Sequence, residues 1–395
     1  MNTPTLRFKE FSGAWEDSSI GDLINEKSAK FNPEKHGDKF KCIELEHLSQ
    51  ETGELLGYVN ASNQKSIKNK FDKGDVLFGK LRPYLKKFLK APFDGVCSTE
   101  IWVLKGKKLS NEFLYQFVQT EQFLTLTNIS SGSKMPRADW GIVSSAVVPT
   151  PTLPEQTKIA NFLTAIDEKI AQLSQTAQLL TDYKKGVMQR IFSQQLRFKD
   201  DDGREFAEWD FIELEKVAFK VNAKNKDCSI TNVLTNSATQ GIVNQADYFD
   251  RDIANQNNLG GYYVVEIDDF VYNPRISNHA LVGSLKRNNL VKGVMSPLYT
   301  VFRFKNGSLP FFEQYFETTH WHDYMKSVAN SGARHDRLNI TNDDFLNLPV
   351  PFPSLPEQTK IANFLTAIDD KINNNQTQLD AMKQYKSGLL QQMFV

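Results

Sequence analysis

The sequence predicts an α+β protein in which two mixed α/β domains are separated by two long antiparallel coiled-coil helices, with a pseudo-two-fold internal repeat. The run LPEQTKIANFLTAID occurs at residues 153–167 and again, unchanged, at residues 355–369. Each copy opens a stretch with helical periodicity, and each follows a region of mixed strand and helix character. An identical run of this length indicates an internal duplication, because composition alone does not produce it.

Each repeated run begins a predicted helix of about 40 residues, roughly 60 Å long at 1.5 Å per residue. Pro154 and Pro356 suit the start of a helix, and Glu155 and Glu357 suit the positive end of its dipole. The apolar residues that follow recur at alternating spacings of four and three, which is typical of a coiled coil. We expect each helix to pack against its sister through Ile159, Leu163, Ile166, Ile170, Ile361, Leu365, Ile368 and Ile372.

The regions between the helices predict domains at 1–152 and 198–354, with helices at 153–197 and 355–395. In the first domain we expect a strand after the Gly74-Asp75 turn, strands at 95–104 and 142–148, and a helix at 111–127. The second domain repeats this order with less identity: IDDFVYNPRIS answers KGDVLFGKLRP, and SGARHDR answers SGSKMPR. The scaffold is repeated, whereas the domain interiors differ.

Charge is balanced over the whole chain, with 47 basic and 47 acidic residues, but the two domains differ. Residues 1–152 hold 21 Lys and Arg against 18 Asp and Glu, and residues 198–354 hold 16 against 21. Balanced charge argues against indiscriminate binding of polyanions, so any DNA-binding surface must be local. No apolar run reaches the roughly 20 residues of a membrane helix, and we expect a cytoplasmic protein without a membrane partner. We expect buried free thiols at Cys42, Cys97 and Cys228.

The sequence lacks the motifs of an enzyme, and no catalytic or metal-binding residue is predicted. There is no GxxxxGK[ST] and no GxGxxG for nucleotide phosphates. Asn273-Pro274-Arg275 is similar to the Asn-Pro-Pro-aromatic motif of amino-methyltransferases but lacks the second proline and the aromatic residue. Asp94 with Glu100-Ile101-Trp102 fails as a nuclease motif, because the lysine is missing. His320 and His322 are more simply explained as surface residues of a helix.

Two features suit contact with double-stranded DNA. Residues 65–90 hold nine basic side chains against two acidic ones, a pattern that suits phosphate contact. The paired loops SSGSKMPR and NSGARHDR carry Arg and His that can reach base edges. A solvated face and a plain loop are the alternative interpretations. The candidate DNA-binding residues are Lys65, Lys68, Lys80, Arg82, Tyr84, Lys86, Lys87, Ser131, Lys134, Arg137, Arg275, Asn278, His279, Arg334, His335 and Arg337.

With its two LPEQ…IA.FL..ID.KI segments, its GD strand elements and its SG loops, the whole chain resembles the specificity subunits of type I restriction–modification systems. The resemblance implies that each variable domain is a target recognition domain that reads one half of a bipartite DNA sequence. It also implies that the helices set the spacing between the halves and dock two modification (methyltransferase) subunits, which restriction (motor-nuclease) subunits then join. S-adenosylmethionine, ATP and Mg²⁺ would belong to those partners, and no cofactor to this chain.

Two other functions stay open from the residues alone. One is an autonomous methyltransferase or nuclease with cryptic motifs, which would modify or cleave DNA without a partner. The other is an adaptor whose domains bind proteins. A bipartite methylation motif that disappears from the host when the gene is deleted would exclude the adaptor.

Overall fold

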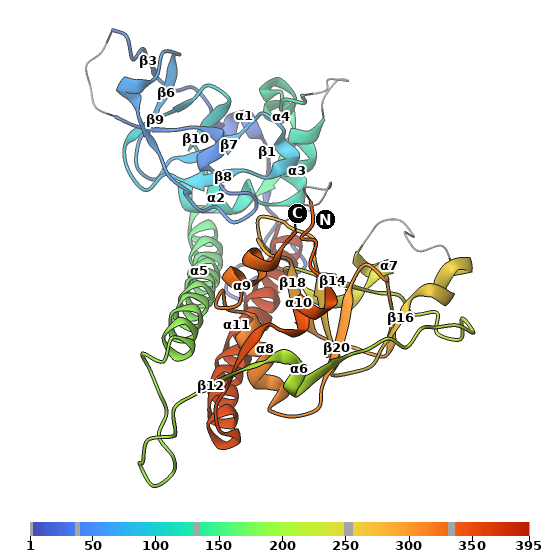
Figure 1. Ribbon diagram of the computed structural model, residues 1–395. Coiled ribbons are helices and arrows are strands. Elements are labelled where there is room, and N and C mark those ends of the chain that lie inside the picture. The colour runs from blue at the N-terminus through green and yellow to red at the C-terminus, as the bar shows by residue number, and fades with distance from the viewer. Residues whose placement is uncertain (1–2, 36–39, 130–134, 249–255, 331–335, 395) are drawn as a thin grey trace. The chain divides into compact units, whose positions relative to one another are not determined.

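The computed structural model describes residues 3–35, 40–129, 135–248, 256–330 and 336–394 (Figure 1). The chain divides into two units, of which the first is built from two separate segments of the chain and the second from one. The first unit contains Met1–Gln175 and Gln376–Val395, and the second contains Thr176–Asn375. Each unit therefore holds one variable region, the first part of one long helix and the last part of the other.

The two repeated runs open continuous helices, α5 (Leu153–Phe192) and α11 (Leu355–Met393), of 40 and 39 residues. Both helices pass through Gly186 and Gly388 without interruption, and no neighbouring atom lies within 4 Å of the position a Cβ would take at either glycine. Within the first unit the beginning of α5 packs with the end of α11, and within the second unit the end of α5 packs with the beginning of α11. The packing is therefore antiparallel, as predicted.

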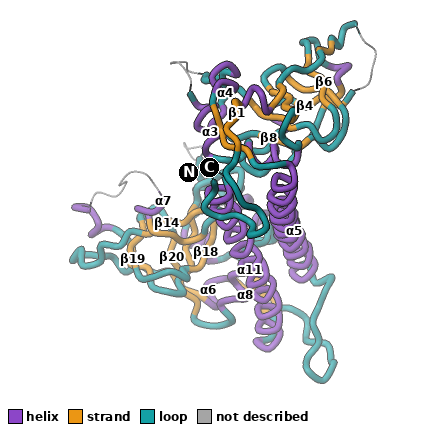
Figure 2. The backbone as a smooth tube through the Cα atoms, turned by 180° about the vertical axis from the view of Figure 1, so that it is seen from behind, coloured by secondary structure: helices purple, strands orange, loops and turns teal. Residues whose placement is uncertain are grey.

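The first unit combines short helices with three sheets. Its short helices are α1 (Ile20–Leu23), α2 (Asn111–Phe117), α3 (Glu121–Asn128) and α4 (Trp140–Ser145). Its strands are β1 (Glu16–Ser19), β2 (Ile24–Asn25), β3 (Lys30–Phe31), β4 (Lys41–Ile43), β5 (Val59–Asn60), β6 (Lys68–Phe71), β7 (Val76–Gly79), β8 (Phe88–Lys90), β9 (Gly95–Ser98), β10 (Ile101–Gly106) and β11 (Val147–Thr150). Figure 2 shows β4 and β6 in one group of strands, and β1 beside α3 and α4 in another.

The second unit also combines short helices with β-strands. Its short helices are α6 (Leu214–Val217), α7 (Gln245–Tyr248), α8 (Leu309–Phe316), α9 (His322–Val328) and α10 (Asn342–Leu346). Its strands are β12 (Asp210–Glu213), β13 (Ala218–Lys220), β14 (Leu234–Ser237), β15 (Gly241–Asn244), β16 (Tyr263–Val265), β17 (Phe270–Asn273), β18 (Ser284–Arg287), β19 (Gly293–Met295), β20 (Thr300–Phe304) and β21 (Pro349–Phe352).

One four-stranded sheet is common to both units. Its order is β2-β10-β7-β8 in the first unit and β13-β20-β17-β18 in the second, and neighbouring strands are antiparallel in both. The proline-rich segment before each long helix pairs with the strand that opens the domain, β1 with β11 and β12 with β21. The remaining strands differ, because the first unit builds a five-stranded sheet, β3-β6-β9-β4-β5, where the second has the pairs β14-β15 and β16-β19.

The turn before the central strand is also built alike in the two units. Gly74 and Asp268 both adopt a positive φ, of 89° and 73°. The carboxylate that follows each of them, on Asp75 and Asp269, accepts a backbone N–H three residues back at 2.8 Å. Lys105 on β10 and Arg303 on β20 pair with these carboxylates. The sequence pattern GD…VLFG therefore encodes a closed turn that leads directly into a buried strand.

Each unit has one main hydrophobic core in which the common sheet, the short helices and both long helices meet. In the first unit Phe78 contacts Phe123, Phe123 contacts Phe117, and Phe117 contacts Phe394, in the same core as the beginning of α5. The predicted helix-packing residues lie in these cores: Ile159, Leu163, Ile166, Ile361, Leu365 and Ile368 are buried, and Ile170 and Ile372 are partly buried. They contact the globular domains as well as the sister helix.

Four local predictions were wrong. Residues 95–104 form two strands, β9 and β10, because a turn interrupts them. Residues 111–127 form two helices, separated at Thr120, whose side chain caps α3. Most of 142–148 belongs to α4, since Asp139 caps that helix by accepting the Gly141 N–H at 2.7 Å. Cys42 and Cys97 are buried as expected, but Cys228 is exposed.

Candidate nucleic-acid interface

The repeated LPEQ motif fastens each long helix to its domain. Glu155 is buried and accepts two hydrogen bonds from the guanidinium of Arg7, at 2.7 and 2.8 Å. Glu357 is buried as well and receives Arg197, with Nη2 at 3.1 Å from Oε2. A buried carboxylate is stable only when it is paired and hydrogen-bonded. The glutamate of each LPEQ motif therefore needs the arginine of the LRF segment that precedes its domain, at 6–8 and 196–198.

The buried glutamine of the same motif hydrogen-bonds to the backbone of its domain. Gln156 accepts the Ser110 N–H at 2.9 Å and donates to the Pro151 carbonyl at 3.0 Å. Gln358 accepts the Ser308 N–H and donates to the Pro353 carbonyl, both at 2.8 Å. Sequence reasoning missed these roles, although the recurrence of LRF before each domain was a usable signal.

A lysine–aspartate pair joins the two long helices inside each unit. Lys386 of α11 pairs with Asp167 of α5 in the first unit, and Lys184 of α5 pairs with Asp369 of α11 at 2.6 Å in the second. A domain glutamine completes each cluster, since Gln116 donates to Asp167 at 2.9 Å and Gln314 donates to Asp369 at 2.8 Å. Because a buried polar cluster is satisfied in one alignment only, the two clusters fix the antiparallel register.

The candidate interface of the first unit is the junction between the segment after β7 and the segment that ends at Arg137. Leu81 and Arg137 form an antiparallel bridge, and the Arg82 N–H donates to the Pro136 carbonyl at 2.8 Å. The Arg137 Nε donates to a Glu100 carboxylate oxygen at 3.0 Å. Arg82 is exposed and has φ 53° and ψ 61°, a conformation that costs energy for a non-glycine residue and is common at functional sites.

The second unit builds the same junction from different side chains. Arg275 and Arg337 form the equivalent antiparallel bridge, and the Ile276 N–H donates to the Asp336 carbonyl at 2.9 Å. A cavity of about 200 Å³ opens there. It is lined by Thr235, Gln245, Tyr262, Asn273, Pro274, Arg275, Ser296, Leu298, Tyr299 and Arg337.

The basic segment 65–90 is less free than its composition indicates. Lys68 is a correction, because it is buried and pairs with Glu44, so its ammonium does not face solvent. Lys86 pairs with Glu121 at 3.2 Å, and Lys87 donates to the Leu45 carbonyl at 2.6 Å. Lys65, Lys80 and Arg82 have no ion-pair partner among the described residues, and Tyr84 is exposed.

Other candidates are placed as follows. Asn278 and His279 are exposed, on the segment between β17 and β18. Ser131, Lys134, Arg334 and His335 lie outside the described residues. His320 precedes α9 and His322 begins it, and burial lowers the pKa of both imidazoles. Within the described ranges no group of three or more His, Cys, Asp and Glu side chains could hold a metal ion, and no described helix is long and apolar enough to cross a membrane.

Comparisons with known proteins relate the whole chain to one family. The model of the type I restriction modification DNA specificity domain matches residues 13–181 and 207–384. The specificity subunit of the type I restriction enzyme EcoDI of Escherichia coli is 29% identical over 168 residues, which cover 41% of this chain and 36% of that protein. The MjaVIII specificity subunit of Methanocaldococcus jannaschii is 24% identical over 424 residues, covering 97% of this chain and 94% of that protein.

Solved structures share the fold. The S subunit of a type I restriction-modification system from M. genitalium matches over 100% of this chain and 99% of its own, with 14% identity and a TM-score of 0.60. A chain from a study of complex assembly in a type I R-M system matches over 95% and 96%, with 17% identity and a TM-score of 0.54. The two family matches coincide with the two repeats found in the sequence, so the chain belongs to the family of type I restriction modification DNA specificity proteins.

Proposed function

We propose that each domain reads one half of a bipartite DNA target and that the long helices set the distance between the halves. One observation carries this proposal: the same four-stranded sheet and the same junction occur in both units, while the side chains at the junction differ. A repeated framework with different reading residues suits a target whose two halves differ in sequence. The recognition domains are residues 1–152 and 198–354, and the helices are 153–197 and 355–395.

The DNA contacts of the first domain centre on the exposed part of its junction. Arg82 is exposed, has a left-handed backbone and lies beside Lys80 and Tyr84 in the sequence. Such an arrangement suits phosphate and base-edge contacts. The full proposed set is Lys65, Lys80, Arg82, Tyr84, Lys86, Lys87, Ser131, Lys134, Arg137, Arg275, Asn278, His279, Arg334, His335 and Arg337.

The helices also dock partner subunits in this proposal. Large apolar side chains are exposed at equivalent positions of the two helices: Leu153 at 58% and Leu355 at 59%, Tyr183 at 54% and Tyr385 at 53%. Exposed aromatic and aliphatic side chains at matched positions suit two copies of one partner. Two modification subunits that carry the methyltransferase chemistry fit this symmetry, and restriction subunits would join them.

The chain itself is then not an enzyme. S-adenosylmethionine, ATP and Mg²⁺ serve the partner subunits, and the complex acts on cytoplasmic double-stranded DNA. This division of labour is supported by the EcoDI and MjaVIII relatives, which are specificity subunits of type I restriction enzymes.

Lengthening both helices tests the spacing role. Four residues are inserted between Gln175 and Thr176 and four between Asn375 and Gln376, where one unit ends and the other begins. These sites leave both lysine–aspartate clusters within their own units. One added turn is about 6 Å, close to two base pairs at about 3.4 Å each.

We expect methylome sequencing of the host to show both half-sites unchanged and a spacer that is one or two base pairs longer. Four residues inserted in the exposed loop at Asp202 serve as the control and should leave the motif as it is. Altered half-sites, or an unchanged spacer in a stable double-insertion variant, would contradict the proposal.

A further inference from the structure

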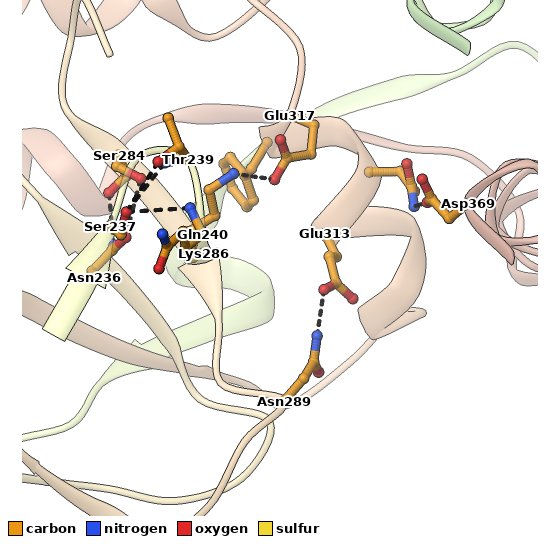
Figure 3. Close-up of polar contacts among 12 residues, drawn as sticks. Asn236, Ser237, Thr239, Gln240, Ser284, Lys286, Asn289, Glu313, Glu317 and Asp369 are labelled. Carbon is orange, nitrogen blue, oxygen red and sulfur yellow. Dashed lines mark hydrogen bonds and ion pairs between the residues drawn. The ribbon is translucent and has the colours of Figure 1, made fainter. Parts of the chain in front are cut away.

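The second domain raises a question of charge, because it is net acidic and most of its cations at the common sheet are already neutralised. Figure 3 shows Lys286 directed at Glu317 and Asn289 at Glu313. Arg287 pairs with Asp268 at 2.6 Å and with Glu313 at 3.0 Å, and Arg303 pairs with Asp269 at 2.6 Å. These cations are held by carboxylates and are poorly placed to meet a DNA phosphate.

Arg275 and Arg337 differ from those cations. They lie directly opposite each other on the antiparallel bridge, where like charges destabilise a pair unless an anion lies between them. Arg275 is exposed and has no ion-pair partner among the described residues. Arg337 has Asp336 as its nearest carboxylate, with Nε 3.7 Å from Oδ2, which is beyond hydrogen-bonding distance.

The Arg337 Nε is a buried donor without an acceptor within the part of the chain that the structure describes. An unsatisfied buried donor costs about 1–3 kcal/mol. The first unit satisfies the equivalent donor internally, because the Arg137 Nε donates to Glu100. Leu298 stands in the second unit where the first has Glu100: Trp102 pairs with Phe78 of β7, Thr300 pairs with Tyr272 of β17, and Glu100 and Leu298 each lie two residues before that paired residue. The structural partner of this arginine has therefore been lost.

The cavity in front of Arg337 has room for a replacement acceptor. Its volume of about 200 Å³ corresponds to roughly six or seven waters of liquid. Both arginines line it, together with the hydrogen-bonding side chains of Thr235, Asn273 and Tyr299. Two guanidinium groups that face one cavity suit an anion with several oxygens, which accepts bidentate hydrogen bonds.

We propose that this cavity binds a backbone phosphate of DNA through Arg275 and Arg337, and that it is the phosphate anchor of the second recognition domain. The inference rests on the proposed DNA-binding function and adds the chemistry of one contact to it. Among its described residues the first domain has no equal anchor, because the Arg137 guanidinium is already hydrogen-bonded to Glu100. Its phosphate contacts come from the exposed cations around Arg82 instead. The two domains thus hold DNA through different parts of one framework.

The test measures binding of the full chain to a duplex that carries its methylated motif and to an unrelated duplex of the same length, at several salt concentrations. Arg337→Ala should weaken binding to both duplexes about five- to tenfold at 0.1 M salt, and the slope of log K against log salt should fall by about 1. The methylated motif should stay unchanged, because a phosphate contact carries no sequence information.

Leu298→Glu is the second variant, and it leaves Arg337 in place. Leu298 is 56% exposed, so a glutamate is tolerated there. Its carboxylate should accept a hydrogen bond from Arg337, as Glu100 accepts one from Arg137. We expect the same loss of affinity and slope, with no further loss when Leu298→Glu and Arg337→Ala are combined. Ile267→Glu is the control for the added charge. Ile267 is exposed and precedes β17, whereas Arg275 follows β17, so this variant should lose less affinity than Leu298→Glu.

The outcomes separate the two proposals. Unchanged affinity and slope in both variants would overturn the anchor, and so would a loss confined to the target duplex with a relaxed base in the motif, because that result identifies a base contact. A wild-type chain that binds neither duplex, in a host without a bipartite methylation motif, would overturn the proposed function itself.

Discussion

The two units of this protein share a scaffold down to single hydrogen bonds, yet they differ where DNA contact is expected. Arg7–Glu155 and Arg197–Glu357 are equivalent, as are the clusters around Asp167 and Asp369. At the junction, by contrast, Glu100 accepts from the Arg137 Nε in the first unit, while the second has Leu298 at that position and the Arg337 Nε has no acceptor among the described residues. The two units are therefore most alike in the contacts that join each domain to the long helices.

The shared contacts have one physical property in common. They are charged or polar groups withdrawn from water, and removing one partner leaves the other buried without compensation. A surface residue that contacts DNA carries no such penalty in the free protein. This difference explains why Glu155, Gln156 and Asp167 of the first LPEQTKIANFLTAID run recur as Glu357, Gln358 and Asp369 in the second, while the junction side chains of the two domains differ.

The largest effect is expected at the buried carboxylates. Arg197→Met leaves Glu357 buried without its guanidinium, and we expect a loss of about 3–5 kcal/mol in the free energy of unfolding of the second unit. Arg7→Met should produce a comparable loss in the first unit. Native-state hydrogen exchange measures the two units separately. A loss below about 1 kcal/mol would show that these pairs are not what fastens the domains.

A smaller loss with a defined pH dependence is expected at the lysine–aspartate cluster. Burial lowers the pKa of Lys386, and Asp167 opposes that shift. Asp167→Asn removes the opposition, so the folded state holds Lys386 less readily in its charged form. We expect a loss of about 3 kcal/mol near neutral pH.

The sign of the pH dependence follows from linkage. With its pKa lowered in the folded state, Lys386 binds fewer protons there than in the unfolded chain, so stability rises as pH rises from the folded pKa toward 10.5. The loss in Asp167→Asn should therefore shrink at alkaline pH. Asp369→Asn is the matched variant in the second unit. A deficit independent of pH would exclude Lys386 as its cause.

A change in DNA affinity, without a change in stability, is expected at Arg82. Arg82→Ala should weaken binding to any duplex and reduce the salt slope by about 1, because one phosphate contact is lost. Lys158→Ala serves as the control. It removes an exposed cation of α5 that pairs with Glu10, and it should leave the slope as it is. An unchanged slope in Arg82→Ala would remove this residue from the DNA-binding set.

The smallest expected effect is a difference between the two units in the reactivity of their cysteine thiols. Burial raises the pKa of Cys42 to about 12 and raises that of Cys97 as well, whereas Cys228 of the second unit is exposed. A thiol reagent at pH 8 should modify one cysteine in the native chain and three after denaturation. Peptide mapping should identify Cys228. Rapid modification of Cys42 would contradict the packing of the first unit.

The long helices and the duplication could be predicted because their signals are local and repeated. Seam spacing, a proline at the start and the absence of any interrupting proline are all properties of neighbouring residues. The short elements were harder, since the turn between β9 and β10 and the Asp139 cap each depend on one or two side chains. Lys68 lies in a basic segment that is typical of a DNA contact, but its side chain is buried and pairs with Glu44, which is distant in sequence.

The difference between the two junctions could not be predicted from either half alone. Glu100 and Arg137 are 37 residues apart, and their contact depends on the bridge between Leu81 and Arg137. Once that framework is known, the replacement of Glu100 by Leu298 becomes meaningful. Long-range pairing, rather than residue type, decides that a carboxylate accepts from the Nε of Arg137 and not, among the described residues, from that of Arg337.

The central claim is that one scaffold carries two independent reading domains, and a chain with two copies of the second domain tests it most directly. Residues 1–152 are replaced by 196–354, so that both long helices and both LPEQ fastenings are kept. Methylome sequencing of a host that expresses this chain should show a motif of two inverted copies of the second half-site, separated by the natural spacer. A stable chain that still methylates the original asymmetric motif, or that yields unrelated half-sites, would contradict the account.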